Sequence, residues 1–310
     1  MNATTDLTKL LVDYVKQLGS PTRSVVGILR YAVYARKAEL KQAFQTGAPL
    51  AEAVKILLES VINEDQLVRK EANRALRFMI EQGFTESEGF VKSLDSFSKF
   101  NLENWFVQPS RALYTLYSLV DTLPKLPSAI AESYLELLPT ILEGRSTHEV
   151  KAMVAQVIEN LFANKHLQGT KTKAVLLQLL SIGSQHIPES SHPIEITSLV
   201  QCLTQVYLNY NAGMPTFAKE LLPKVLDTLT EILGLTPDEV TQFDHATLRL
   251  IKDRVTRNIE LALIMSCDEY LFPSDEGLDF IGALTIDESE GSLFADFGKK
   301  QSPNMSKHSV

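Results

Sequence analysis

Apolar residues recur along this chain at intervals of three and four, in long stretches separated by glycine and proline. No stretch shows the sustained alternation of apolar and polar residues that marks a half-buried strand, so the spacing predicts helices throughout. Gly19, Gly47 and Gly83 each mark a predicted helix end. Thr85, with Glu88 three residues later, predicts the N-cap of the helix that follows Gly83.

One apolar pattern, with positions 0, +4, +7 and +8, returns near every 40 residues. It starts at Val25, Val68, Ala112, Val150, Leu199 and Val255. The first three intervals are 43, 44 and 38 residues, and the last two are 49 and 56, so the second half is looser or carries insertions. Because each copy follows another apolar helix, the repeats predict a stack of helical hairpins.

The segment from Asp65 to Leu76 resembles the second helix of a HEAT repeat. It has the Asp of the turn, then Val68-Arg69, the small Ala72, and Ala75-Leu76. Residues 148–158 are a degenerate copy. The resemblance to the HEAT/armadillo class implies an all-α, right-handed α-solenoid of roughly six hairpins. We expect this HEAT/ARM-like domain to cover residues 1–271, with a looser joint near 185–193.

The C-terminal segment has a different composition from the rest of the chain. Residues 268–310 carry −6 of the net charge of −8, and the apolar residues there are isolated. We therefore predict that residues 272–310 form an acidic, Ser-rich disordered tail. Leu293, Phe294 and Phe297 lie among acids, as in many short docking motifs. The alternatives are an inert solubilising tail and a tail that folds back on a basic groove.

Residues with the spacing of known catalytic motifs are lacking, and we expect no enzyme, cofactor or metal site. The six histidines are scattered, and the two cysteines, Cys202 and Cys267, are expected to be small buried hydrophobes. No apolar run approaches the roughly 20 residues of a membrane span. The first residues do not resemble a secretory signal. These features favour a cytoplasmic or nuclear protein.

Basic side chains on the predicted second helices are the candidate partner-binding residues. Lys70, Arg74 and Arg77 lie at i, i+4 and i+7, away from the apolar face, and Arg254 and Arg257 occur in a related helix. Second helices line the concave surface in the resembled family. That resemblance implies a basic groove with aromatic residues, suited to an acidic or extended peptide. The groove would include Tyr31, Tyr34, Tyr114 and Tyr117. The alternative is an ordinary solvated face whose charge is balanced by Glu71 and Glu81.

These features together favour a non-enzymatic scaffold or adaptor that binds a protein partner through its helical surface, its acidic-aromatic tail, or both. Trp105 and Phe106, with Phe97 and Phe100, are expected to pack in the core between repeats rather than bind a partner. One alternative function is a regulatory subunit or assembly chaperone of one large partner. Another is a nucleic-acid-binding helical-repeat protein, which the low net charge of residues 1–267 disfavours.

Overall fold

The computed structural model describes residues 3–40, 49–164, 167, 169–186, 192–233, 249, 253 and 256–258. Within these ranges the regular elements are all helices, which confirms the predicted all-α class. The α-helices are α1 (Ala3–Leu18), α2 (Arg23–Tyr34), α3 (Lys37–Leu40), α4 (Pro49–Ser60), α5 (Gln66–Glu81), α6 (Glu88–Glu103), α7 (Pro109–Thr122), α8 (Ser128–Glu143), α9 (His148–Asn164), α10 (Gly169–His186), α11 (Pro193–Gly213) and α12 (Pro215–Leu233). Two short 3₁₀ helices are η1 (Phe84–Glu86) and η2 (Leu123–Lys125).

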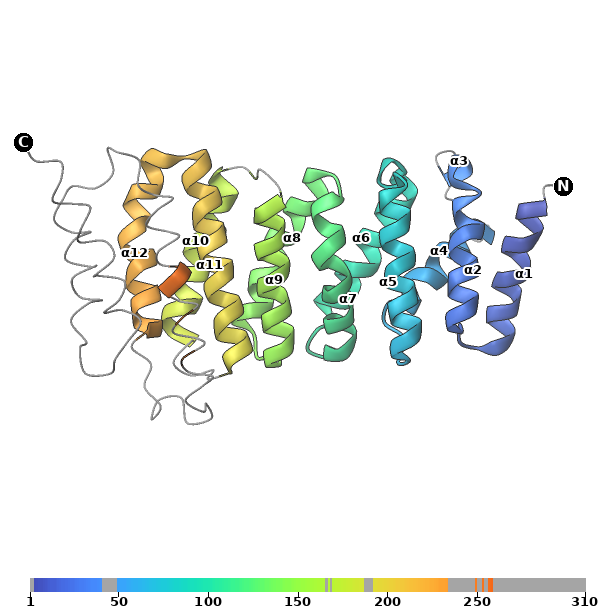
Figure 1. The fold of residues 1–310 in the computed structure, drawn as a ribbon, viewed down its shortest axis with the longest axis horizontal. Coiled ribbons are helices and arrows are strands. Elements are labelled where there is room, and N and C mark those ends of the chain that lie inside the picture. The colour runs from blue at the N-terminus through green and yellow to red at the C-terminus, as the bar shows by residue number, and fades with distance from the viewer. Residues whose placement is uncertain are drawn as a thin grey trace, which may run out of the picture.

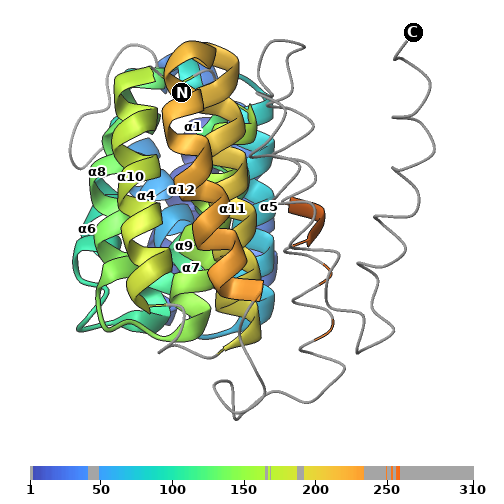
Figure 2. The same ribbon diagram turned by 90° about the vertical axis from the view of Figure 1, so that its left-hand side faces the viewer.

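The long helices form two layers that follow the order of the chain (Figure 1). The first layer contains α1, α4, α6, α8, α10 and α12, and the second layer contains α2, α5, α7, α9 and α11 (Figure 2). Neighbours within each layer contact one another, and each helix also packs on its partner in the other layer. The helices are therefore stacked along the long axis from α1 to α12.

The repeated apolar pattern forms the buried face of the second layer. In α5, for example, Val68, Ala72, Ala75 and Leu76 are no more than 4% exposed. In the first five copies of the pattern every position is buried except Val120, which is half-buried. Positions 0, +4, +7 and +8 share one face of a helix, so the pattern decides which side faces the core. The sixth copy, which starts at Val255, lies outside the described residues.

A hydrogen bond between successive second helices occurs in the same register twice. Asn160 Nδ2 in α9 donates to the carbonyl of Val120 in α7 at 2.5 Å, and Asn209 Nδ2 in α11 donates to the carbonyl of Phe162 in α9 at 3.2 Å. Both acceptors are the third residue from the end of their helix. Carbonyls at a helix end lack an intrahelical partner, so each bond satisfies a polar group that packing would otherwise bury.

The predicted helix ends at Gly19 and Gly83 are confirmed, since both glycines have positive φ, of 70° and 79°, directly after helices. The predicted N-cap at Thr85 is wrong, because Thr85 lies within η1. Ser87 caps α6 instead, and its Oγ accepts from the Phe90 N–H at 3.5 Å. Phe84 explains the shift. It is fully buried and packs edge-to-face on Phe90, which holds residues 84–86 in a 3₁₀ turn.

Several predicted features lie next to or outside the described residues. Gly47 and the tail at 272–310 lie outside the described residues. At the predicted joint, α10 ends at His186 and α11 begins at Pro193. On either side of this connection the helices stay in their layers, with α10 packed on α8 and α11 packed on α9.

The aromatic residues around Trp105 divide between core and surface. Phe97 and Trp105 pack against the core, as expected, whereas Phe100 and Phe106 are 62% and 67% exposed, against that expectation. The Trp105 ring lies against Gly144, where an added Cβ would be only 2.6 Å from Cζ2. Trp105 therefore fills the space between the turn after α6 and the end of α8.

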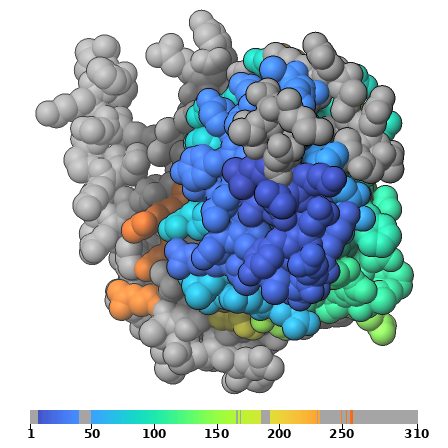
Figure 3. Space-filling view, turned by 90° about the vertical axis from the view of Figure 1, so that its right-hand side faces the viewer, coloured from blue at the N-terminus to red at the C-terminus, as the bar shows by residue number. Residues whose placement is uncertain are grey.

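The N-terminal end of the stack carries an apolar surface. Figure 3 views this end, where α1 forms the outer face. Leu7, Leu10, Tyr14 and Leu18 follow one side of α1 and are 43–65% exposed. Val12 and Val15 on another side are buried against the core. Within the described residues, other helices therefore cover only one side of α1.

The contact between Trp105 and Gly144 gives a test of packing between repeats. Gly144→Ala should lower the free energy of unfolding by about 1–3 kcal/mol, because the new methyl group meets the indole ring. Its φ of −74° is open to any residue, so the effect is steric rather than conformational. The matched control is Gly213→Ala, where a Cβ meets nothing within 4 Å. Urea unfolding followed by circular dichroism should show a loss for Gly144→Ala and none for Gly213→Ala. Equal effects would contradict the packing described for Trp105.

Candidate functional site

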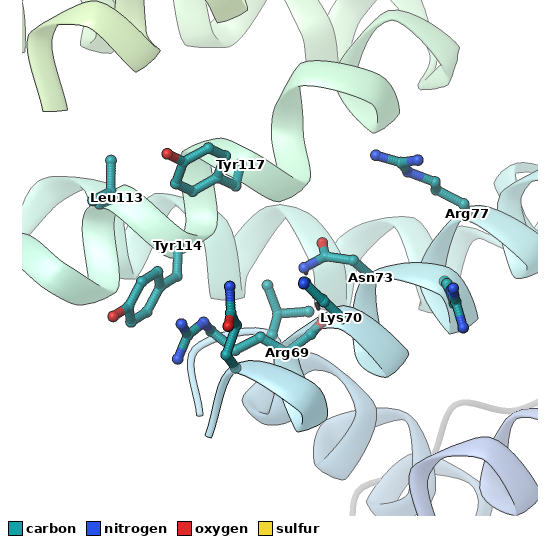
Figure 4. Close-up of a pocket in the computed structure, with 10 residues that line it drawn as sticks. Arg69, Lys70, Asn73, Arg77, Leu113, Tyr114 and Tyr117 are labelled. Carbon is teal, nitrogen blue, oxygen red and sulfur yellow. Dashed lines mark hydrogen bonds between the residues drawn. The ribbon is translucent and has the colours of Figure 1, made fainter. Parts of the chain in front are cut away.

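A groove with a volume of about 660 Å³ lies between α5 and α7 (Figure 4). Four of its lining residues are cations, namely Arg69, Lys70, Arg74 and Arg77, and three others are Leu113, Tyr114 and Tyr117. None of the lining residues is acidic. The structure thus brings the three predicted α5 cations together with two of the four predicted tyrosines.

The core face of α5 sets the direction of these cations. Because the apolar pattern of α5 faces inward, Lys70, Arg74 and Arg77 project from the opposite side of the helix. The side chains of Arg74 and Arg77 are 67% and 54% exposed. Lys70 is also exposed, and it forms no ion pair with any residue that the structure describes.

Arg69 forms a fixed end of the groove. Its guanidinium lies 3.9 Å from the centre of the Tyr114 ring, a cation–π contact that links α5 to α7. Its Nη1 donates to the carbonyls of Asn63 and Glu64 at 2.6 and 2.8 Å. These three contacts orient the side chain without a carboxylate, and Arg69 forms no ion pair with a described residue.

Glu71 is a buried acid beside the groove. Its side chain is 11% exposed, and its carboxylate lies 3.4 Å from Arg30, 3.6 Å from Arg74 and 3.9 Å from Arg23. Gly27 in α2 leaves room for this carboxylate, since an added Cβ there would be 3.3 Å from Oε1. One buried charge therefore holds three arginines from two helices on one side of the molecule.

The surface around the groove has a surplus of positive charge. Arg77 pairs with Asp121 across the gap between α5 and α7. Among the described residues, four arginines, Arg23, Arg30, Arg74 and Arg77, share the carboxylates of Glu71 and Asp121, and Arg69 and Lys70 pair with neither. Glu71 does compensate charge, as the alternative interpretation of this face predicted, but only in part. Glu81 lines an adjoining hollow of about 490 Å³ with Arg77. A basic hollow in a chain of net charge −8 concentrates anions locally.

The other predicted site residues lie elsewhere. Tyr31 and Tyr34 in α2 pack edge-to-face on Phe78, so they are not lining residues of the groove. Arg257 is exposed and is not a lining residue either. Arg254, Leu293, Phe294 and Phe297 lie outside the described residues.

A second polar cluster joins α9 to α11, and the sequence did not reveal it. His148 Nδ1 is 2.6 Å from Glu195 Oε2, and Lys151 Nζ is 3.5 Å from Glu195 Oε1. The His148 ring also stacks on His192 at 4.8 Å. His148 and Glu195 are 47 residues apart and belong to the first turns of successive second helices. The repeat period was therefore the one signal that could have paired them.

The pKa of Glu149 is lowered first by its own backbone N–H and then by the Thr147 hydroxyl, as expected at a helix N-terminus. Burial raises the pKa of the Cys202 thiol, and the charge of Glu159 adds to this. Cys202 is thus a buried residue, as predicted. In the described part of the chain, no three His, Cys, Asp or Glu residues are grouped to hold a metal ion. None of the described helices is long and apolar enough to cross a membrane.

Comparisons with known proteins add little. No protein-family model matches the chain, and no curated protein sequence is significantly similar to it. Two crystal structures of engineered proteins from the Northeast Structural Genomics Consortium are 15% and 16% identical to this chain, each with a TM-score of 0.42. Each match covers 84% of this chain, and the matches cover 98% and 100% of the two engineered proteins. A third engineered protein is 12% identical, with a TM-score of 0.36. The match covers 94% of this chain and 86% of that protein. These scores are too low to support an argument about fold or function.

Glu71 should be important for stability. Glu71→Gln keeps the shape of the side chain but leaves Arg30, which is 17% exposed, without its carboxylate. We expect the free energy of unfolding to fall by about 1–3 kcal/mol. The control, Glu136→Gln on the exposed side of α8, should change it by no more than about 0.5 kcal/mol. Chemical denaturation of the two variants checks this, and equal stabilities would show that Glu71 is not needed to hold the arginines.

Proposed function

We propose that this protein is a non-enzymatic scaffold or adaptor and that the groove between α5 and α7 binds an acidic, extended segment of a protein partner. We further propose that the stack is an α-solenoid of the HEAT/armadillo kind, with its second helices forming the recognition surface. The observation that carries the proposal is the groove itself, which has four cations and exposed aromatic surface and no acidic lining residue.

The chemistry of the groove suits carboxylates. Arginine offers a planar fork of donors that matches a carboxylate, and Arg74 and Arg77 are both more than half exposed. Lys70 adds a charge that forms no ion pair with a described residue. Tyr117, which is 52% exposed, offers an apolar ring with a polar tip beside these cations.

The dimensions of the groove suit a short segment. Its α5 side runs from Gln66 to Arg77, which at about 1.5 Å per residue is roughly 16 Å. An extended chain rises about 3.3 Å per residue, so about five residues would cover that length. A loop or a terminal segment of a folded partner could supply them without unfolding the partner.

The groove cations should control binding. Full-length protein is titrated into a fluorescein-labelled peptide of glutamates that contains one tyrosine, and binding is followed by fluorescence anisotropy. Lys70→Glu should weaken binding at least tenfold, because it removes one attraction and adds a repulsion at the same point. The matched control is Lys92→Glu, which makes the same charge change on exposed α6 in the other layer and should leave the affinity within about twofold.

Three results would count against the proposal. Wild-type protein that does not bind the peptide would remove its basis. Equal losses for Lys70→Glu and Lys92→Glu would show a diffuse charge effect rather than a groove. Tighter, salt-dependent binding of a duplex oligonucleotide at the same residues would favour the nucleic-acid alternative.

A further inference from the structure

We propose that residues 287–297 of this same chain occupy the α5–α7 groove and compete there with a partner. The inference rests on the proposed function, because it assigns to the chain itself a ligand of the kind that the groove selects. The occupant is a segment outside the described residues, so its assignment depends on its sequence and on the groove. Charge, apolar content and reach each support it.

The charges of the two parts are complementary. Residues 287–297 contain four acids, Asp287, Glu288, Glu290 and Asp296, and no base. The groove lining contains four cations and no acid. Both charge sets are concentrated in a chain whose residues 1–267 are close to neutral, at −2. Pairing them would bring local charges of opposite sign together.

The groove also offers apolar surface to the segment. Leu113, Tyr114 and Tyr117 line its α7 side (Figure 4). The segment carries Leu293 and Phe294 beside its acids, so it can supply apolar side chains for this surface as well as carboxylates for the cations.

The segment is longer than the groove. About five extended residues cover the α5 side of the groove, so the remainder of residues 287–297 would continue along the surface beyond it.

The chain is long enough for this contact. The last described residue, Asn258, belongs to the short segment 256–258, which lies on the same side of the molecule as α5 and α11 (Figure 2, dark orange). The 28 residues between Asn258 and Asp287 can span up to roughly 90 Å. Neighbouring packed helices are about 10 Å apart, so α5 lies only about 30 Å along the layer from α11.

Tethering makes such a contact effective even when its intrinsic affinity is weak. A peptide tether that spans the distance between two sites gives an effective concentration on the order of a millimolar. A segment with a dissociation constant of about 0.1 mM would then reduce the affinity of the groove for an external ligand about tenfold. A partner would have to exceed that competition, so the tail would set the threshold for binding.

The test uses the full chain with a free, fluorescein-labelled peptide of residues 287–297 as probe. Leu293→Ala, Phe294→Ala and Phe297→Ala are combined in the protein to weaken its own segment. The probe should bind this variant at least tenfold more tightly than it binds the wild-type chain. The matched control combines Leu278→Ala, Phe280→Ala and Ile281→Ala, which removes apolar side chains from the same tail outside the segment and should leave the affinity unchanged.

The outcomes separate the two proposals. Adding Lys70→Glu to the segment variant should abolish the gain, which places the probe in the groove. Equal affinities for wild-type and segment variant would overturn this inference, and the proposed function would still stand if Lys70→Glu weakened the glutamate probe. A gain that depends on protein concentration would show that one copy occupies another, against occupation within one chain. Failure of both probes to bind any form would overturn both proposals.

Discussion

The apolar stripe along each second helix constrains almost everything else in this molecule. Among the described residues each of these helices packs only on other helices, so its stripe must be buried against its partner in the other layer and its neighbours in its own. In α5 that stripe runs from Val68 to Leu76, and burying it fixes the rotation of the helix about its axis. Lys70, Arg74 and Arg77 are exposed side by side because no other rotation of α5 would keep Val68, Ala72 and Leu76 inside.

Glu71 shows how the charged surface is reconciled with this packing. A cluster of arginines on adjacent helices would repel itself, and a buried carboxylate between Arg30, Arg74 and Arg23 offsets part of that repulsion. Because Glu71 points toward α2 rather than into the groove, it stabilises the cluster without neutralising the α7 side. Arg69 is held in another way, by backbone carbonyls and the Tyr114 ring. The contacts of Glu71 and those of Arg69 thus hold cations in place and leave part of their positive charge uncompensated.

Local periodicity was sufficient to predict the buried faces and the side of α5 on which the cations lie. It failed where a single distant contact decides the structure. Thr85 had the sequence of an N-cap, but the burial of Phe84 against Phe90 moved the start of α6 to Ser87. The pairing of His148 with Glu195 and the bond from Asn160 to Val120 join residues 47 and 40 positions apart. No local pattern encodes such contacts, since they depend on how closely successive repeats approach.

The distance of approach also explains why the groove lies between α5 and α7. Helix separation follows the size of the side chains in the contact. α9 and α11 bury small residues, among them Ala152, Ala155, Ser198 and Cys202, and these two helices share the most extensive contact in the stack. On the facing sides of α5 and α7, long side chains such as Arg69 and Arg77 meet Tyr114 and Asp121. These side chains bridge the helices at their ends and hold them apart between the bridges. One architecture thus gives a closed seam between α9 and α11 and an open, charged groove between α5 and α7, where long side chains that flank the stripe bridge the two helices.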